Sequence, residues 1–105
     1  MRARSFVSIA AALTFPIAAF AQEPATQAFN AAMEKMMADM HMEPTGDADR
    51  GFAMMMIPHH QGAIDMAKVE LEHGDDPQMR AMAEKVIEAQ EKEIAELKEW
   101  LEANP

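Results

Sequence analysis

Residues 54–66 read Met-Met-Met-Ile-Pro-His-His-Gln-Gly-Ala-Ile-Asp-Met, and the rest of the chain is organised around this stretch. Met55 precedes His59 by four residues, and Met56 precedes His60 by the same interval, so each pair lies side by side on a helix surface. Thioether sulfur prefers Cu(I) or its heavier analogue Ag(I), and neutral imidazole accepts copper in either oxidation state. The stretch therefore predicts a soft-metal site, with copper favoured over zinc, iron or magnesium.

The N-terminal segment, residues 1–21, has the features of a secretory signal peptide. Arg2 and Arg4 give it a basic start, residues 6–20 form an uncharged apolar run, and Ala21 supplies a small residue at the expected cut. The run is shorter than the roughly 20 apolar residues that a membrane-spanning helix needs. We predict that this signal is removed and that residues 22–105, a Met- and His-rich helical metal-binding domain, enter the periplasm without a membrane anchor.

The composition of the mature part favours a partner that is a cation. Without Arg2 and Arg4, seven Lys and Arg remain against 18 Asp and Glu, a net charge of −11. Such a surface repels nucleic acid and concentrates cations. The chain has no cysteine but 12 methionines, most of them between residues 33 and 82. Because no disulfide is available, stability must come from packing, from a metal or from self-association.

The first predicted helix runs from Thr26, as its N-cap, to His41. Apolar side chains recur along it at helical intervals, at Phe29, Met33, Met36 and Met40. Such a methionine stripe is either an adaptable core or a set of metal contacts, and both interpretations stay open. Residues 43–46, Glu-Pro-Thr-Gly, break the helix.

The second predicted helix runs from Asp49 to His73, with Asp47 or Asp49 as its cap and Gly74 as its stop. One side of it carries a mixed stripe of apolar and ligand-type residues: Phe52, Met55, Met56, His59, Ala63, Met66 and Glu70. Polar groups buried on such a stripe need partners, since an unpaired one costs about 1–3 kcal/mol, and a metal is one such partner. Pro58 either bends this helix or starts a new one after an extended Ile57.

The third predicted helix begins with Asp76 as cap and Pro77 in its first turn, and runs to Glu102. Its buried seam is expected at Met79, Ala83, Val86, Gln90, Ile94 (or its neighbour Glu93), Leu97 and Leu101. Gln90 is the polar member of that seam. It is expected either to hydrogen-bond a histidine or Gln61 and orient it, or to fix the register between helices.

Several of these segments together resemble the domain-of-unknown-function 305 family, small exported helical proteins that include the CopM-like copper-binding proteins. The resemblance rests on Phe52, on residues 55–67, and on Gln90, residues 93–94 and residues 100–101. It implies an all-α, ferritin-like helical bundle that binds copper, and silver, through methionine and histidine. Longer relatives have a fourth helix, whereas this chain has three in its mature part, so a homodimer would complete the bundle. By position, the implied ligands are Met55, Met56, His59, His60 and Met66, with Met36, Met37, Met40 and His41 as secondary ligands.

The expected function is binding rather than catalysis: chelation of Cu(I) or Ag(I) for copper tolerance or trafficking, with a copper-transfer partner protein as a further partner. One alternative is a carboxylate di-iron site, suggested by the Glu-x-x-His spacing of Glu70 and His73. A b-type haem held by Met and His is a second, and a structural or adaptor bundle without metal is a third. No segment has the pattern of an activated nucleophile, a phosphate loop or a zinc protease helix.

Overall fold

The computed structural model describes residues 11–13, 23–41, 43 and 45–105, and within them the chain is helical without strands. The helices are α1 (Pro24–Asp39), α2 (Ala48–His73) and α3 (Pro77–Ala103). The predicted all-α class with three helices is therefore confirmed. The predicted signal peptide lies outside the described residues except for residues 11–13. Over the described part of the chain, no helix has the length and apolar character needed to cross a membrane.

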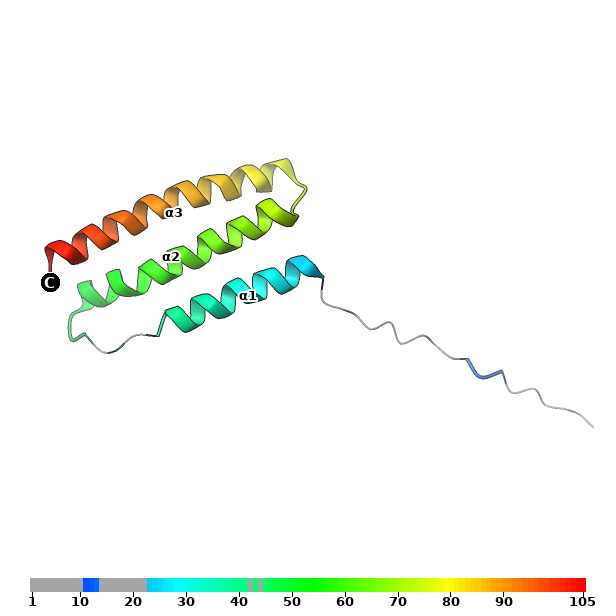
Figure 1. The fold of residues 1–105 in the computed structure, drawn as a ribbon, viewed down its shortest axis with the longest axis horizontal. Coiled ribbons are helices and arrows are strands. Elements are labelled where there is room, and N and C mark those ends of the chain that lie inside the picture. Colours follow the sequence, from blue (N-terminus) through cyan, green and yellow to red (C-terminus); the bar gives the residue numbers. More distant parts are fainter. Residues whose placement is uncertain (1–10, 14–22, 42, 44) are drawn as a thin grey trace, which may run out of the picture.

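The three helices lie side by side with α2 in the middle (Figure 1). Helix α2 packs against both of its neighbours, whereas α1 and α3 make no contact with each other within the described residues. Successive helices run in opposite directions, as short connections require. The bundle is therefore an open layer, and both broad faces of α2 are left uncovered by the residues that the structure describes.

The ends of α2 and α3 are set by local side-chain caps. The carboxylate of Asp47 accepts a hydrogen bond from the backbone N–H of Asp49 at 3.0 Å. Asp76 accepts one from the N–H of Met79 at 2.9 Å. These contacts satisfy backbone donors that have no partner inside a helix, and they confirm the predicted starts of both helices.

Two expectations about helix ends and breaks are corrected. Helix α1 begins at Pro24, and no side chain caps it, so the prediction of Thr26 as N-cap is wrong. A proline in the first turn needs no partner for an N–H that it lacks, which lets the helix start earlier. Helix α2 continues through Pro58, so a new helix starting there is also excluded.

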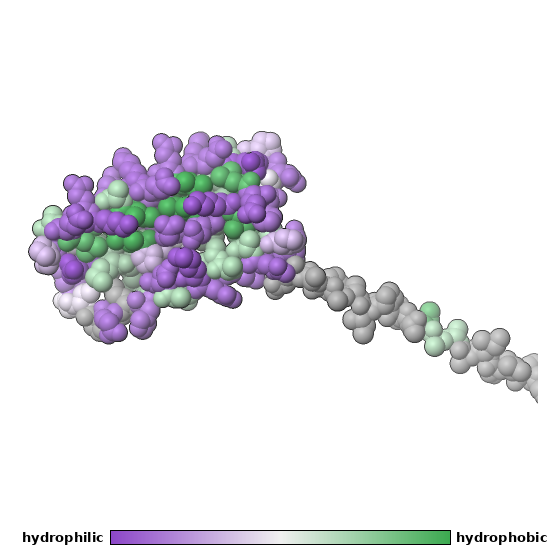
Figure 2. Space-filling model, viewed as in Figure 1, coloured by the Kyte–Doolittle hydropathy of each residue, from purple (hydrophilic) through white to green (hydrophobic). Residues whose placement is uncertain are grey.

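The contact between α2 and α3 forms the larger part of the core. On α2 it uses Ala53, Ile64 and Ala67, which share a side with His60 at helical intervals and are 3%, 2% and 7% exposed. On α3 it uses Ala83 and Ile94, both buried. Figure 2 shows a hydrophobic strip that runs between these two helices along one open face. Three of these five side chains are alanine, so small residues make much of this contact.

Helix α1 reaches α2 through a glycine. A Cβ placed on Gly62 would lie 2.7 Å from Cγ and 2.9 Å from Cβ of Met36, closer than real contacts allow. Gly62 is therefore needed for Met36 to sit against α2. The adjacent buried residue on α1 is Ala32, at 8% exposure.

The large apolar side chains of the predicted stripes lie outside this core. Phe29 and Met33 of α1 are 36% and 51% exposed, so the core interpretation of the α1 stripe is wrong for these two residues. Phe52 on α2 and Met79 on α3 are 63% and 45% exposed. The helices bury their small residues against one another and leave many of the large ones on the open faces.

Candidate metal-binding pockets

His60 lies in the middle of α2, in the contact with α3, and is 8% exposed. Its Nε2 atom lies 2.5 Å from Oε2 of Glu93, which comes from α3 and whose side chain is 50% exposed. The carboxylate accepts a hydrogen bond from the ring and holds the imidazole in one orientation. The pair links the middle of α2 to α3.

The other ring nitrogen of His60 has no partner. Its Nδ1 atom is buried and makes no hydrogen bond within the described part of the chain. With the proton on Nε2 and directed at Glu93, the neutral ring carries a lone pair on Nδ1. Histidines that bind metals commonly donate their second ring N–H to a carboxylate, which fixes the tautomer and leaves the other nitrogen as the ligand. Glu93 and His60 have this arrangement.

His59 is separated from this pair by its position on the helix. Its side chain is exposed, and its ring centroid lies 6.0 Å from that of His60, with the ring planes at 59°. Consecutive residues on a helix point in different directions, which accounts for the divergence. One imidazole is therefore buried in a helix contact and the other faces an open side of the layer.

A pocket of about 550 Å³ opens between α2 and α3 beside His60. We call it the α2–α3 pocket. Its lining is Asp49, Phe52, Ala53, Met56, His60, Glu93, Glu96, Leu97 and Trp100. It brings Met56 and His60 together as predicted from their spacing. Three carboxylates also line it, so its lining is acidic as well as apolar.

A second pocket, of about 440 Å³, lies where the end of α1 meets α2. We call it the methionine pocket, because Met40, Met54 and Met55 line it together with His41. The rest of the lining is Asp39, Glu43, Ile57, Pro58, Gln61, Ile94 and Lys98. Sulfur from α2 thus lines one space together with Met40 and His41, which directly follow α1.

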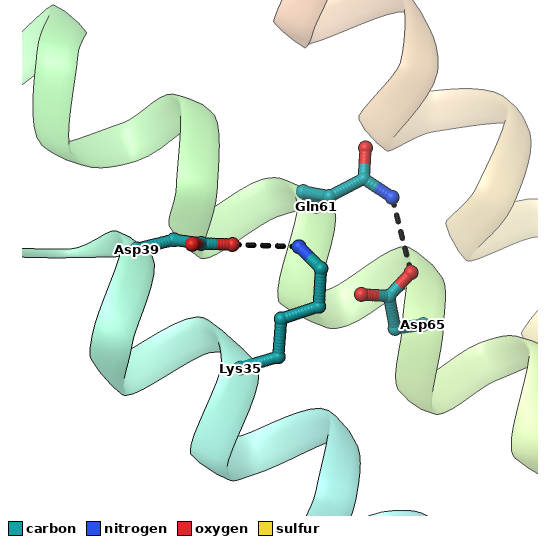
Figure 3. Close-up of polar contacts among 4 residues, drawn as sticks. All are labelled: Lys35, Asp39, Gln61 and Asp65. Carbon is teal, nitrogen blue, oxygen red and sulfur yellow. Dashed lines mark hydrogen bonds and ion pairs between the residues drawn. The ribbon is translucent and has the colours of Figure 1, made fainter.

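The groups at the mouth of the methionine pocket are charged and exposed. Asp39 pairs with Lys35 one turn earlier on α1, with Nζ to Oδ2 at 2.6 Å (Figure 3). This hydrogen bond raises the pKa of Lys35 above 10.5. His41 Nε2 lies 3.8 Å from Oε1 of Glu43 on the exposed connection to α2. Two carboxylates therefore lie beside the soft donors, and one of them, Asp39, is already paired with Lys35.

The predicted ligands do not form a single site. Met55 joins Met40 and His41 at the methionine pocket, whereas Met56 joins His60 at the α2–α3 pocket. The remaining predicted ligands lie apart from both pocket linings. His59 is exposed, Met66 is half-buried, Met36 packs on Gly62, and Met37 is 66% exposed.

Two residues with clear roles were absent from the predicted ligand set. Met54 lines the methionine pocket. It lies one helical turn before Pro58, which lines the same pocket, and this spacing is the sequence feature that could have identified it. Glu93 is the partner of His60, a role that the sequence suggested for Gln90. Gln61 was the other suggested partner of Gln90, but its amide donates to Asp65 at 3.1 Å on the same helix (Figure 3).

In the part of the chain that the structure describes, hard ligands alone do not gather at one site. Within the described residues, no three His, Cys, Asp or Glu side chains come together in a way that holds a metal ion. Both pockets contain thioether sulfur in addition to such groups. A metal at either pocket would therefore depend on methionine.

The sequence matches one protein family, described as Domain of unknown function (DUF305), over residues 12–101. Among curated proteins, none matches it. The match spans all three helices nearly to the end of α3.

Proposed function

Since this chain belongs to the DUF305 family, whose copper-binding CopM-like members it resembles, we propose that it is an exported protein that chelates Cu(I) and Ag(I). The cargo is held by thioether sulfur and imidazole nitrogen. No step of bond making in a substrate is involved, and the protein acts by binding. Copper tolerance or trafficking is the proposed role, with release to a copper-accepting partner protein.

The observation that carries this proposal is the lining of the methionine pocket. Met40 and His41 come from the end of α1, and Met54 and Met55 come from α2. Thioether is an uncharged, soft donor that favours Cu(I) and Ag(I) over the harder cations of the cell. Three thioethers and one imidazole around a single space form a donor set of this kind.

The electrostatic surroundings of the pocket support the choice of a cation. Asp39 and Glu43 line it, and the whole chain has a formal net charge of −9. Negative charge near a neutral donor set raises the local concentration of a monovalent cation and offsets its charge once bound. In the lining itself, two carboxylates stand against the ammonium of Lys98, and Asp39 is also paired with Lys35 outside the lining.

The α2–α3 pocket supplies a second pair of donors in different surroundings. Met56 and the Nδ1 atom of His60 are the soft ligands on this side. Glu93 holds the imidazole with its Nδ1 lone pair available. We assign this pair a secondary role, because it offers one thioether where the methionine pocket offers three.

The proposal includes a location. Export through the signal peptide at residues 1–21 would place the protein in the periplasm. An uncharged donor such as thioether suits that compartment, because methionine does not form disulfides as cysteine thiols do in an oxidising environment. Edman or mass analysis of the exported chain would read Gln22 as its first residue.

The test is a competition for Cu(I) between the exported protein and a chromogenic chelator. The critical variant is the triple change Met40→Leu, Met54→Leu and Met55→Leu, which removes three sulfurs at nearly constant volume. We expect Cu(I) affinity to fall at least about 100-fold, or about 2.7 kcal/mol. The matched control is the triple change Met33→Leu, Met37→Leu and Met79→Leu, at exposed positions outside the pocket, with affinity unchanged. Equal losses in the two triple variants, or no binding by the natural chain, would refute the proposal.

A further inference from the structure

Helix α2 presents a row of side chains with the spacing of a coiled-coil seam. Phe52, Met56, His59, Ala63 and Met66 follow one another at intervals of four and three residues. In coiled coils this alternation places side chains in a line that packs against another helix. His59 is at the centre of the row, seven residues from each end.

Neither neighbouring helix covers this row. Helix α1 contacts α2 at Gly62, and α3 contacts it at His60 and the buried residues aligned with it. Those two contacts lie on opposite flanks of α2, and the row runs between them. Phe52 is 63% exposed, His59 is exposed, and Met56, Ala63 and Met66 are only half-buried. A seam is therefore present without its partner helix.

The other two helices extend the same apolar face. On α3, Trp100 lines the α2–α3 pocket together with Phe52 and is 37% exposed. Met82, 51% exposed, lies five helical turns before Trp100 on the same side. On α1, Met33 faces away from the side that carries Lys35 and Asp39, and is likewise 51% exposed. We call this surface the seam face.

The size of the seam face matches that of a protein interface. Helix α2 has 26 residues, which is about 39 Å of length at 1.5 Å per residue. With helices about 9 Å apart, and α1 only about 24 Å long from its 16 residues, the whole broad face has a footprint of about 900 Å². A stable complex of standard size buries about 800 Å² on each partner. The face is large enough for one such contact.

The α2 row at the centre of the seam face is uncharged, and this suits a second copy of the same row. The row carries no charged side chain from Phe52 to Met66, whereas the chain as a whole has a net charge of −9. Two copies that meet through this row bring uncharged strips together, with the carboxylates of the α2–α3 pocket, Asp49, Glu93 and Glu96, beside them. A twofold symmetric contact also needs only one patch, used by both partners.

We propose that a second copy of this chain covers the seam face, about a twofold axis that passes near His59 and crosses α2. In this arrangement the two α2 helices run antiparallel. Glu70, the next residue of the row after Met66, would face another Glu70 if the helices were parallel, and the antiparallel arrangement separates them. His59 then lies beside His59 of the partner subunit, and position 52 lies opposite position 66. This contact does not require copper.

Single cysteines test the arrangement directly, because the natural chain contains none. The exported protein with His59→Cys is expected to form disulfide-linked dimers under mild oxidation, since the two positions meet at the axis. The matched control is Lys68→Cys, an exposed position on the opposite face of the same helix, which is expected to stay unlinked. A mixture of Phe52→Cys and Met66→Cys chains should cross-link between the two kinds of chain. The natural protein should have the mass of a dimer by light scattering.

Three outcomes would overturn the proposal. They are a monomeric mass throughout the micromolar range, equal cross-linking at positions 59 and 68, and cross-linking of Phe52→Cys chains with themselves in preference to Met66→Cys chains. Circular dichroism of each variant checks that the helices remain. Cu(I) titration of the same natural preparation separates the two proposals, because a monomer that binds Cu(I) refutes only the dimer, and a dimer that binds none refutes only the copper function.

Discussion

Helix α2 packs against α3 on one side and against α1 on the other, and the two contacts differ in kind. Towards α3, the helix buries Ile64 and the hydrogen-bonded His60. Hydrogen bonds also join both ends of the two helices. Arg50 donates to the Asn104 carbonyl at 2.8 Å, and Arg80 donates to the Leu71 carbonyl at 2.7 Å. Towards α1, the contact centres on Gly62 and Met36, beside methionines that remain partly exposed. The first side is a packed hairpin, and the second is a lighter contact.

The difference assigns a role to each side. Side chains with little freedom, such as His60 held by Glu93, set the hairpin in one arrangement. Methionine has three rotatable side-chain bonds and a polarizable sulfur, so Met54 and Met55 would be able to adapt their positions around the proposed cation. In the proposed function, the α1 side is the place where cation binding and the docking of α1 are coupled. In the proposed function, a bound ion joins α1 to the hairpin.

Truncation of the packed side should give the largest loss of stability. Ile64→Ala removes a side chain that is 2% exposed and leaves a cavity, so we expect the free energy of unfolding to fall by about 3 kcal/mol. Urea denaturation followed by circular dichroism measures this loss. Ile57→Ala, at a half-buried position, is the matched control and should cost clearly less. Equal losses at the two positions would contradict the packing difference.

A methyl group added at Gly62 tests the contact between α2 and α1. Gly62→Ala places a methyl group against Met36, so we expect a loss of about 1–2 kcal/mol from overpacking. Without α1 in this position, the same change would instead stabilise α2 by about 1 kcal/mol through helix propensity. The sign of the change in urea denaturation therefore decides whether α1 docks here.

Adding Met36→Ala to Gly62→Ala should recover part of the loss, because it clears the outer atoms of that side chain. Since α1 supplies Met40 and His41 to the methionine pocket, Gly62→Ala should also weaken Cu(I) binding in the chelator competition. Unchanged binding would mean that the ligands from α1 are dispensable.

Removing the charge that orients His60 should have a smaller effect. Glu93→Gln keeps the shape but loses the charge-assisted hydrogen bond, and we expect a cost of about 1 kcal/mol, reduced because the carboxylate is half exposed. Glu91→Gln, at an exposed position of the same helix, is the control. Nitrogen NMR of the His60 ring should show that Glu93→Gln alone weakens the preference for the proton on Nε2. An unchanged tautomer would remove the positioning role.

The smallest effect is expected at the exposed ion pair of α1. The hydrogen bond to Asp39 raises the pKa of Lys35, so the ammonium form is favoured by folding. The associated stabilisation is present at neutral pH and is lost as pH rises past the raised pKa, above 10.5. Asp39→Asn should therefore lower the melting temperature slightly at pH 7 and not at all in strong alkali. A difference that grows with pH would contradict this assignment.

The sequence predicted the helix ends where the signal is local. Asp76 followed by Pro77 starts α3 as expected, and Gly74 ends α2 with its N–H donating to the Glu70 carbonyl at 2.7 Å. Such signals involve residues within one turn of each other, so sequence spacing is enough to read them. The prediction of Thr26 as N-cap failed because α1 begins two residues earlier, at Pro24.

Which faces of the helices meet was harder to predict. A stripe of large apolar residues usually marks the buried side of a helix, yet α2 buries Ala53, Gly62 and Ala67 and exposes Phe52. Among the described residues, two helices pack against α2, and most of the residues that it buries are small. The pairing of His60 with Glu93 spans 33 residues, so no local spacing reveals it.

The most direct test of the copper proposal is X-ray absorption at the copper edge of the Cu(I)-loaded exported protein. We expect sulfur atoms in the first coordination shell of the natural chain. In the variant with Met40→Leu, Met54→Leu and Met55→Leu, that sulfur signal should be lost or strongly reduced. A first shell of nitrogen and oxygen alone in the natural protein, or a sulfur signal unaffected by the three changes, would contradict the assignment of Cu(I) to the methionine pocket.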